Sequence, residues 1–217
     1  MKILVLFLCL LSWASAFAAD FTYLSEESIN LDDIPAPPEE GSAQDLADMA
    51  TVLNWQKVRT RNDCEKAEFE SSAFATSFYG IPYGPLSTAQ AEKLVIFQDV
   101  LFKEIRYFYK TLKNRYLRPR PYDRDPRINS CSSRHNSFAY PSGHAAIAYI
   151  SSRAFALLYP DKKDEFYARA ESIALGRVLS GVHHPTDIEA GVILGEKVFD
   201  ALMRSEKFKQ DMEKLRP

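Results

Sequence analysis

Apolar side chains recur at helical spacing along most of the chain. The clearest case is residues 87–116, where apolar residues follow one another at intervals of three or four: Leu94, Phe97, Leu101, Ile105, Phe108 and Leu112. Such a stripe occupies one face of a helix, because 3.6 residues complete a turn. Similar patterns predict helices over residues 42–78, 142–158, 164–179 and 186–204. No segment of useful length alternates between apolar and polar residues, so the sequence predicts an all-α, compact helical bundle.

Two segments rich in proline interrupt this pattern. Residues 19–42 are polar and contain several turn-forming residues, which predicts an extended N-terminal arm before a helical domain over residues 43–217. Ser42 is the candidate N-cap of the first helix of that domain. Residues 117–140 contain three prolines and are expected to form an irregular loop.

Residues 1–18 have the layout of a secretory signal peptide. Lys2 precedes an apolar run over residues 3–13, and the small residues Ala14, Ala16 and Ala18 follow it. The run is shorter than the roughly 20 residues that a helix needs to cross a bilayer, which makes a membrane anchor the less favoured alternative. We therefore expect cleavage near Ala18, a periplasmic or secreted mature chain, and no stable membrane insertion after cleavage.

The charge of the chain is balanced overall but uneven along its length. The 217 residues are 46% hydrophobic and 26% charged, and the formal net charge is −2, which argues against a protein that coats nucleic acid. Residues 110–134, however, contain eight basic and two acidic residues, a local net charge of +6. A solvated loop, an anion funnel, a nucleic-acid patch and a contact with acidic lipid are all compatible with such a run.

Cys64 and Cys131 are the two cysteines beyond the expected signal peptide. Export would bring them into an oxidising compartment, where a disulfide persists. The sequence leaves this disulfide open, because bonded cysteines need Cβ atoms about 4 Å apart and spacing alone does not establish that.

Three short motifs combine basic, small and titratable residues. They read K-x6-R-P from Lys113, P-S-G-H from Pro141 and R-x5-H-x3-D from Arg177. Each motif is weak alone, but together they fix ten residue identities at set spacings and in a set order.

The first candidate function of these motifs is to bind a tetrahedral dianion. Arg120 and Arg177 offer paired N–H donors to pairs of oxygens, and the ammonium group of Lys113 adds a compact charge. Ser142 and Gly143 stand where a predicted helix begins, so free backbone N–H groups and the helix dipole also favour an anion there. We therefore expect a phosphate group to be bound by these residues.

His183 and Asp187 are the second candidate pair. A carboxylate four residues after a histidine can accept the Nδ1–H, which fixes the tautomer and leaves Nε2 free to attack phosphorus. A buried pair that only caps the following helix is the alternative. His144 is then available as a proton donor. Beyond these histidines, the sequence has no cluster of His, Cys or Asp at metal-ligand spacing.

On these motifs the sequence resembles the type 2 phosphatidic acid phosphatase superfamily, which also contains the vanadium haloperoxidases. Within it, the sequence is most similar to the bacterial class A non-specific acid phosphatases, over roughly residues 35–204. The resemblance implies an exported, all-helical enzyme that hydrolyses small phosphate monoesters through a covalent phosphohistidine, without a metal or another cofactor. His183 would be the nucleophile, Asp187 its orienting partner, and His144 the acid and later the base. The resemblance assigns the phosphoryl oxygens to Lys113, Arg120, Ser142, Gly143 and Arg177.

Several positions depart from the family pattern or lie outside it. Gly176 replaces a usual serine, and Ala139 and Ala145 flank the second motif where serine or glycine and threonine are usual, which bears on substrate preference more than on the reaction. We expect His135 and His184 to be loop residues or residues behind the site, not substrate contacts.

Three other functions are compatible with the sequence. A lipid or polyprenyl phosphate phosphatase would use the same chemistry on a membrane-borne substrate, and a vanadate-dependent haloperoxidase would use the same anion site. A non-catalytic phosphate-binding module would need the basic loop but not the two histidines. The natural substrate, the balance between hydrolysis and phosphotransfer, and a homo-oligomeric state are left open.

Overall fold

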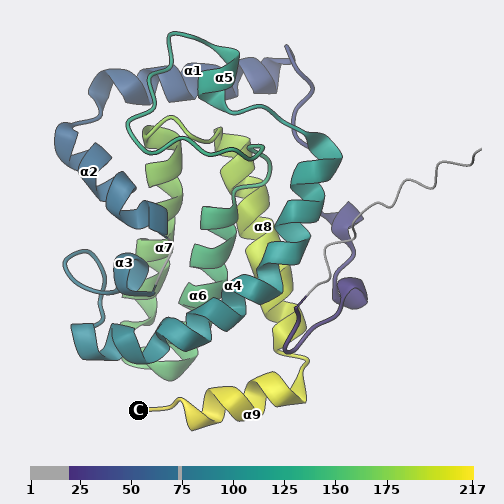
Figure 1. The fold of residues 1–217 in the computed structure, drawn as a ribbon, viewed down its shortest axis with the longest axis vertical. Coiled ribbons are helices and arrows are strands. Elements are labelled where there is room, and N and C mark those ends of the chain that lie inside the picture. Colours follow the sequence, from purple (N-terminus) through teal and green to yellow (C-terminus); the bar gives the residue numbers. More distant parts are fainter. Residues whose placement is uncertain (1–19, 73–74) are drawn as a thin grey trace, which may run out of the picture.

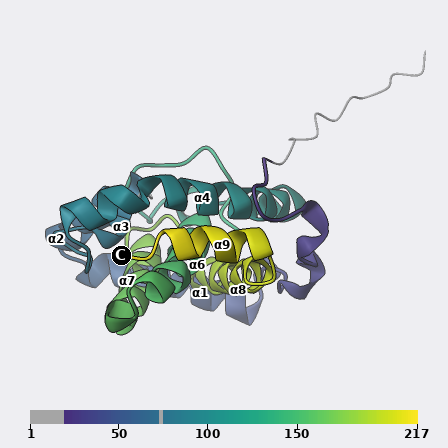
Figure 2. The same ribbon diagram turned by 90° about the horizontal axis from the view of Figure 1, so that it is seen from below.

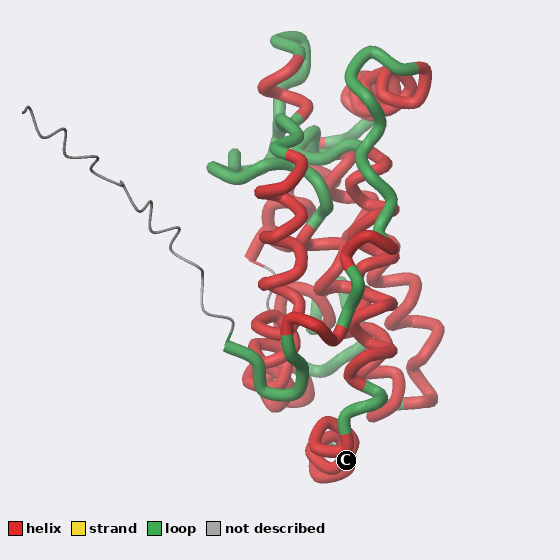
Figure 3. The backbone as a smooth tube through the Cα atoms, turned by 90° about the vertical axis from the view of Figure 1, so that its right-hand side faces the viewer, coloured by secondary structure: helices red, strands yellow, loops and turns green. Residues whose placement is uncertain are grey.

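The computed structural model describes residues 20–72 and 75–217, and these residues form helices and loops without any strand (Figure 3). The prediction of an all-α fold is therefore confirmed for the described part of the chain. The expected signal peptide, residues 1–18, lies outside the described residues.

Three helices lie side by side at the centre of the molecule (Figure 1): α6 (Gly143–Leu158), α7 (Lys163–Leu179) and α8 (Pro185–Leu202). The middle helix, α6, packs against both of the others. The longest helix, α4 (Thr88–Tyr116), crosses this layer on one side (Figure 2). Helix α1 (Ala43–Val58) lies across the end of the layer, where α7 ends and α8 begins (Figure 1).

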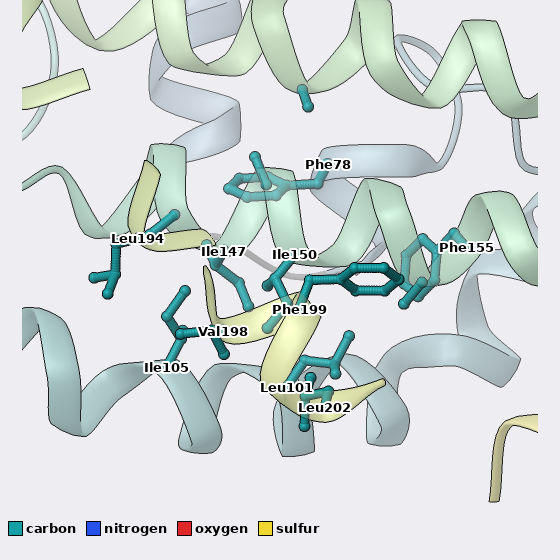
Figure 4. Close-up of a cluster of buried hydrophobic side chains, with 14 of the residues drawn as sticks. Phe78, Leu101, Ile105, Ile147, Ile150, Phe155, Leu194, Val198, Phe199 and Leu202 are labelled. Atoms are coloured by element: carbon teal, nitrogen blue, oxygen red, sulfur yellow. The ribbon is translucent and has the colours of Figure 1, made fainter. Parts of the chain in front are cut away.

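The main core is formed where α4, α6 and α8 meet, together with α3 (Ala75–Tyr79) (Figure 4). Every residue of the apolar stripe predicted for α4 is buried, which confirms the face that the periodicity indicated. The side chains that meet here include Leu101 and Ile105 from α4, Ile147 and Ile150 from α6, and Leu194, Val198 and Leu202 from α8. This packing fixes α4, which carries Lys113 of the first motif, against the N-terminal half of α6, where the second motif ends at His144.

The predicted helical stretch over residues 42–78 is in fact divided into α1, α2 (Arg61–Phe69) and α3, with a 3-10 turn at Glu70–Ser72. The division arises because Thr60 starts a new helix. Its hydroxyl accepts the backbone N–H of Asp63 at 3.2 Å, and the Asp63 carboxylate accepts the N–H of Thr60 at 2.8 Å. Ser42 caps α1 as predicted, accepting the N–H of Asp45 at 3.3 Å.

Residues 117–140 are irregular as predicted, apart from one helical turn, α5 (Pro121–Arg124). The chain leaves α4 through Leu117, whose φ of 49° is left-handed. Cys131, in this loop, forms a disulfide with Cys64 of α2, with 5.6 Å between their Cα atoms.

Two terminal features differ from the sequence prediction. The described part of the N-terminal arm is not simply extended: it contains 3-10 turns at Glu26–Ser28 and Leu31–Asp33 and is held to α4 by Glu104, which accepts backbone N–H groups of the arm. At the other end, the unpredicted helix α9 (Glu206–Lys214) follows α8. Within the chain, a further 3-10 turn at Pro160–Lys162 precedes α7. Among the described residues, no helix combines the length and apolar character that a bilayer span requires.

Candidate active site

The three motifs meet at one cavity of about 380 Å³. It lies between α4, α6, the 117–140 loop and the turn before α8. The motif residues that line it are Lys113, Arg120, Gly143, His144 and His183. The other three candidate residues, Ser142, Arg177 and Asp187, are fully buried and do not line the cavity. The structure therefore brings the eight candidates together in two layers.

Lys113 and Arg120 are held by backbone carbonyl groups. The ammonium group of Lys113, on the last turn of α4, donates to the carbonyl oxygens of Phe138 and, at 3.1 Å, of Ala139. Arg120 Nε donates to the Ser137 carbonyl at 2.7 Å. Neither side chain forms an ion pair with a described carboxylate. Burial, followed by the charge of Arg120, lowers the pKa of Lys113 to about 7. An anion in the cavity would therefore relieve a concentration of uncompensated positive charge.

Arg177 lies behind the wall of the cavity, although the resemblance implied a direct contact with phosphoryl oxygens. Its Nη1 donates to the Ala67 carbonyl at 2.9 Å, and its Nη2 lies 3.4 Å from His135 Nε2. Its buried Nε has no hydrogen-bond partner among the described residues. Burial, then the charge of Arg120, lowers the pKa of Arg177 to about 10. The unpartnered N–H is a buried donor without compensation, which is rare and costly in a folded protein.

His135 is a loop residue, as expected, and it lines the cavity. Its ring centroid is 5.8 Å from that of His144, and its Nε2 faces Arg177. Burial, followed by the charges of Arg120 and Arg177, lowers the pKa of His135 to about 4. The sequence offered no signal for this position, because only the path of an irregular loop brings His135 to the site.

The contacts of His183 define its tautomer. Arg120 Nη1 lies 3.2 Å from His183 Nε2, and Asp187 Oδ2 lies 3.2 Å from His183 Nδ1. An arginine can only donate, so Nε2 must be the acceptor and Nδ1 must carry the proton that Asp187 accepts. Burial, followed by the charge of Arg120, holds the pKa of His183 well below its usual value. The imidazole is thus neutral, with its lone pair on the nitrogen nearer the cationic cavity.

Asp187 joins both histidines of the third motif. Its Oδ2 also accepts the backbone N–H of His184 at 2.8 Å and lies 2.9 Å from the Nδ1 of that residue. Burial disfavours the carboxylate, but hydrogen bonds from His183 and His184 outweigh it and hold the pKa of Asp187 well below its usual range. His184 is therefore a buried residue behind the site, as expected.

Sequence reasoning missed Arg118, which binds Asp187 from the other side. Arg118 Nη1 donates to Asp187 Oδ1 at 2.7 Å, and its Nη2 donates to Asp48 Oδ2 at 2.8 Å. Arg118 Nη2 also lies 3.2 Å from Asp45 of α1, which in turn pairs with Arg124. Part of the basic run is therefore neutralised by α1, while Lys113 and Arg120 face the cavity. The only available signal was the position of Arg118 inside the first motif.

His144 occupies the first turn of α6. Ser142 caps this helix by accepting the N–H of Ala145 at 3.3 Å, and the N–H of Ser142 donates to the Asp187 carbonyl at 2.8 Å. His144 Nε2 donates to the Ser71 carbonyl at 2.9 Å, since a carbonyl can only accept. Burial, then the charge of Arg177, lowers the pKa of His144 well below its usual value. An anion beside the start of α6 would counter those cationic neighbours and favour protonation.

The glycine that departs from the family pattern has a structural reason. A Cβ atom at Gly176 would lie 3.2 Å from Oε2 of Glu70, a carboxylate that pairs with Arg169 at 2.5 Å. A serine at this position would crowd that buried pair.

Among residues 20–72 and 75–217, no three His, Cys, Asp or Glu side chains form a group suited to a metal ion.

The chain is similar to several known phosphatases. The chain is 24% identical to a non-specific acid phosphatase of Providencia stuartii over 83% of this chain and 77% of that protein. It is 39% identical to a lipid A 1-phosphatase of Rhizobium johnstonii, but over only 29% of this chain and 26% of that protein. Its fold is similar to the crystal structure of a transmembrane PAP2 type phosphatidylglycerolphosphate phosphatase from Bacillus subtilis, with a TM-score of 0.53, 21% identity, and coverage of 81% of this chain and 89% of that one. The family model described as PAP2 superfamily matches residues 96–210, which is more than half of the sequence, and the chain therefore belongs to the PAP2 superfamily.

Proposed function

We propose that this protein is an exported acid phosphatase that hydrolyses phosphate monoesters through a covalent phosphohistidine at His183, without a metal ion. The observation that carries the proposal is the alignment of Asp187, His183 and Arg120. It leaves His183 Nε2 unprotonated at the wall of a cationic cavity. The relatives named acid phosphatase support this choice of reaction.

In the first step, the phosphoryl group lies between Lys113 and Arg120, and His183 Nε2 attacks phosphorus. The new N–P bond forms as the P–O bond to the alcohol breaks, and His144 gives its proton to the departing oxygen. Asp187 stabilises the positive charge that develops on the His183 ring. The lysine and arginine stabilise the equatorial oxygens, where the charge of a phosphoryl-transfer transition state is spread.

In the second step, the neutral His144 takes a proton from a water molecule that attacks the phosphorus. The N–P bond breaks, inorganic phosphate forms, and His183 Nε2 regains its lone pair. One water is consumed and one alcohol released for each phosphate. The first step needs His144 protonated and His183 neutral, which predicts a bell-shaped pH profile with an acidic optimum.

Two features support export. The first eighteen residues have the composition of a signal peptide, and a disulfide joins Cys64 to Cys131. Disulfides persist outside the reducing cytosol, so the bond fits a periplasmic or secreted protein.

A lipid phosphatase is the second candidate function. The specific observation in its favour is the 39% identity to lipid A 1-phosphatase, although this covers 64 residues only. Parallel assays of a water-soluble aryl phosphate and of a phosphorylated lipid in detergent micelles distinguish the two. A kcat/KM at least tenfold higher for the lipid would favour this candidate over the first.

The test of the proposed function is hydrolysis of p-nitrophenyl phosphate by wild type, His183→Gln and His184→Gln. Both variants remove an imidazole beside Asp187, but only His183 lines the cavity. We expect wild-type turnover to resist EDTA and to be inhibited by vanadate, and we expect His183→Gln alone to lose nearly all turnover. Retained turnover in His183→Gln would exclude the proposed nucleophile, and loss of turnover with EDTA would exclude the metal-free reaction. Peroxide-dependent oxidation of bromide by the vanadate-loaded protein would indicate a haloperoxidase instead.

A further inference from the structure

The cavity extends well beyond the phosphate-binding residues. One face of α4 lines it, and the residues on that face recur at helical intervals: Val95, Gln98, Phe102, Tyr109 and Lys113. On α6, the lining continues from His144 to Ile147. The next turn of α6 carries Ser151, whose Oγ lies 3.3 Å from Gln98 Nε2. Since Ser151 follows His144 by two turns, Gln98 lies about 10 Å along α6 from the proton donor.

The two ends of this cavity differ in chemistry. The phosphate end is cationic, whereas the section beyond it is bounded by Phe102, Ile147 and Val95. Asp99 also lines this section, but its carboxylate is paired with Lys103 at 3.1 Å. An alcohol that extends from the phosphate along α6 would therefore meet apolar side chains first.

Gln98, at the far end, has an incomplete set of hydrogen bonds. Its side chain is 2% exposed, its Nε2 donates to Ser151, and its buried Oε1 has no partner among the described residues. A buried carbonyl oxygen without a donor is costly, because it has lost its water and gained nothing in return. If the amide were turned round, its N–H end would be unpartnered instead. A hydroxyl group could complete the set in either case, since it both donates and accepts.

We propose that this section is a leaving-group subsite for phosphate monoesters whose alcohol has an apolar body ending in a hydroxyl group, which Gln98 binds. The proposal rests on the proposed function of the same cavity. Gln98 is then a specificity-determining residue that acts on the alcohol and not on the phosphoryl group.

Three aryl phosphates test the subsite. Biphenyl-4-yl phosphate fills the apolar section, 4′-hydroxybiphenyl-4-yl phosphate adds a hydroxyl group at the far end, and phenyl phosphate stops short of Gln98. We expect wild type to favour the hydroxylated biphenyl over the plain one by about tenfold in kcat/KM, the size of one hydrogen bond. Gln98→Met keeps the length of the side chain but removes the amide, and should bring that ratio close to one. Gln210→Met is the matched control, because Gln210 is exposed on α9 and should leave the ratio as in wild type.

A ratio near one in wild type, or the same ratio in Gln98→Met as in wild type, would overturn the subsite. Hydrolysis of phenyl phosphate by wild type would uphold the proposed function even then, so the two failures are distinguishable. The corresponding pair of non-hydrolysable phosphonates, compared by titration calorimetry, gives the ratio of Kd values independently of turnover. If Gln98→Met does not fold, this pair decides the question in wild-type protein alone, where equal Kd values would contradict the proposal.

Discussion

Arg118 and Asp187 form a buried ion pair, with 2.7 Å between Arg118 Nη1 and Asp187 Oδ1. This contact leaves Asp187 Oδ2 for the two histidines. Because Arg118 also binds Asp48 at 2.8 Å, it connects α1 to the carboxylate that orients His183. We interpret Arg118 as a positioning residue: it touches no cavity atom but fixes the direction of Asp187.

Arg118→Lys tests this positioning role. A lysine keeps the charge but cannot direct separate N–H groups to Asp187 and Asp48, so the His183 ring should lose its fixed orientation. We expect kcat for p-nitrophenyl phosphate to fall by about 10²-fold, as for a misplaced catalytic group, with KM changing much less. The matched control is Arg127→Lys, at an exposed ion pair with Asp125, which should leave kcat within twofold. An unchanged kcat in Arg118→Lys would show that Asp187 needs no such support.

His135 should make the unliganded protein less stable in acid. Its pKa is about 4 in the folded protein, against the usual 6.5, so below pH 6.5 the unfolded chain binds the proton more readily than the folded one. Stability therefore falls as the pH drops from 6.5 towards 4. Removing the ring in His135→Asn should reduce the loss of Tm between pH 7 and pH 5 by about 2–4 °C, the change expected for roughly 1 kcal/mol. Thermal unfolding by circular dichroism in phosphate-free buffer measures this, and equal losses in both proteins would contradict it.

The disulfide between Cys64 and Cys131 should stabilise the site as well as the fold. It closes a separation of 67 residues, and Ala67 and Ser132, which both contact Arg177, lie close to the two cysteines in sequence. Reduction by dithiothreitol should lower the free energy of unfolding by about 2–4 kcal/mol, measured by urea denaturation. The doubly substituted variant Cys64→Ala, Cys131→Ala is the control, since the reductant should not affect it. A urea midpoint that dithiothreitol leaves unchanged in wild type would argue against the bond.

Local patterns predicted those parts of the fold that depend on a single helix face. The stripe of α4, the N-cap at Ser42 and the start of a helix at residues 142–143 are determined by residues within one or two turns, and the structure agrees with them. The break at Thr60 was missed, because apolar spacing continues across it although the capping box divides the helix. The amphipathic helix α9 was missed too, since only Phe208 and Met212 mark its buried face.

At the site, the features that could not be predicted from the sequence are those that depend on tertiary structure. Spacing alone could relate His183 to Asp187, but it could not show which arginines of the basic run face the cavity. Arg118 turns to the acids of α1, whereas Arg120, two residues later, turns to His183. The positions of Arg177 behind the wall and of His135 in it depend on how the 117–140 loop folds over the bundle. The spacing of apolar residues does not predict how this irregular loop folds over the bundle.

The most direct test of the account is to trap the phosphoenzyme. Wild type is mixed rapidly with a ³²P-labelled aryl phosphate and denatured in alkali, where phosphohistidine survives, and labelled peptides are mapped by mass spectrometry. We predict phosphate on the peptide that contains His183, at His183 itself, and none in His183→Gln. Phosphate on another residue, or rapid turnover of wild type with no labelled protein at any time after mixing, would contradict it.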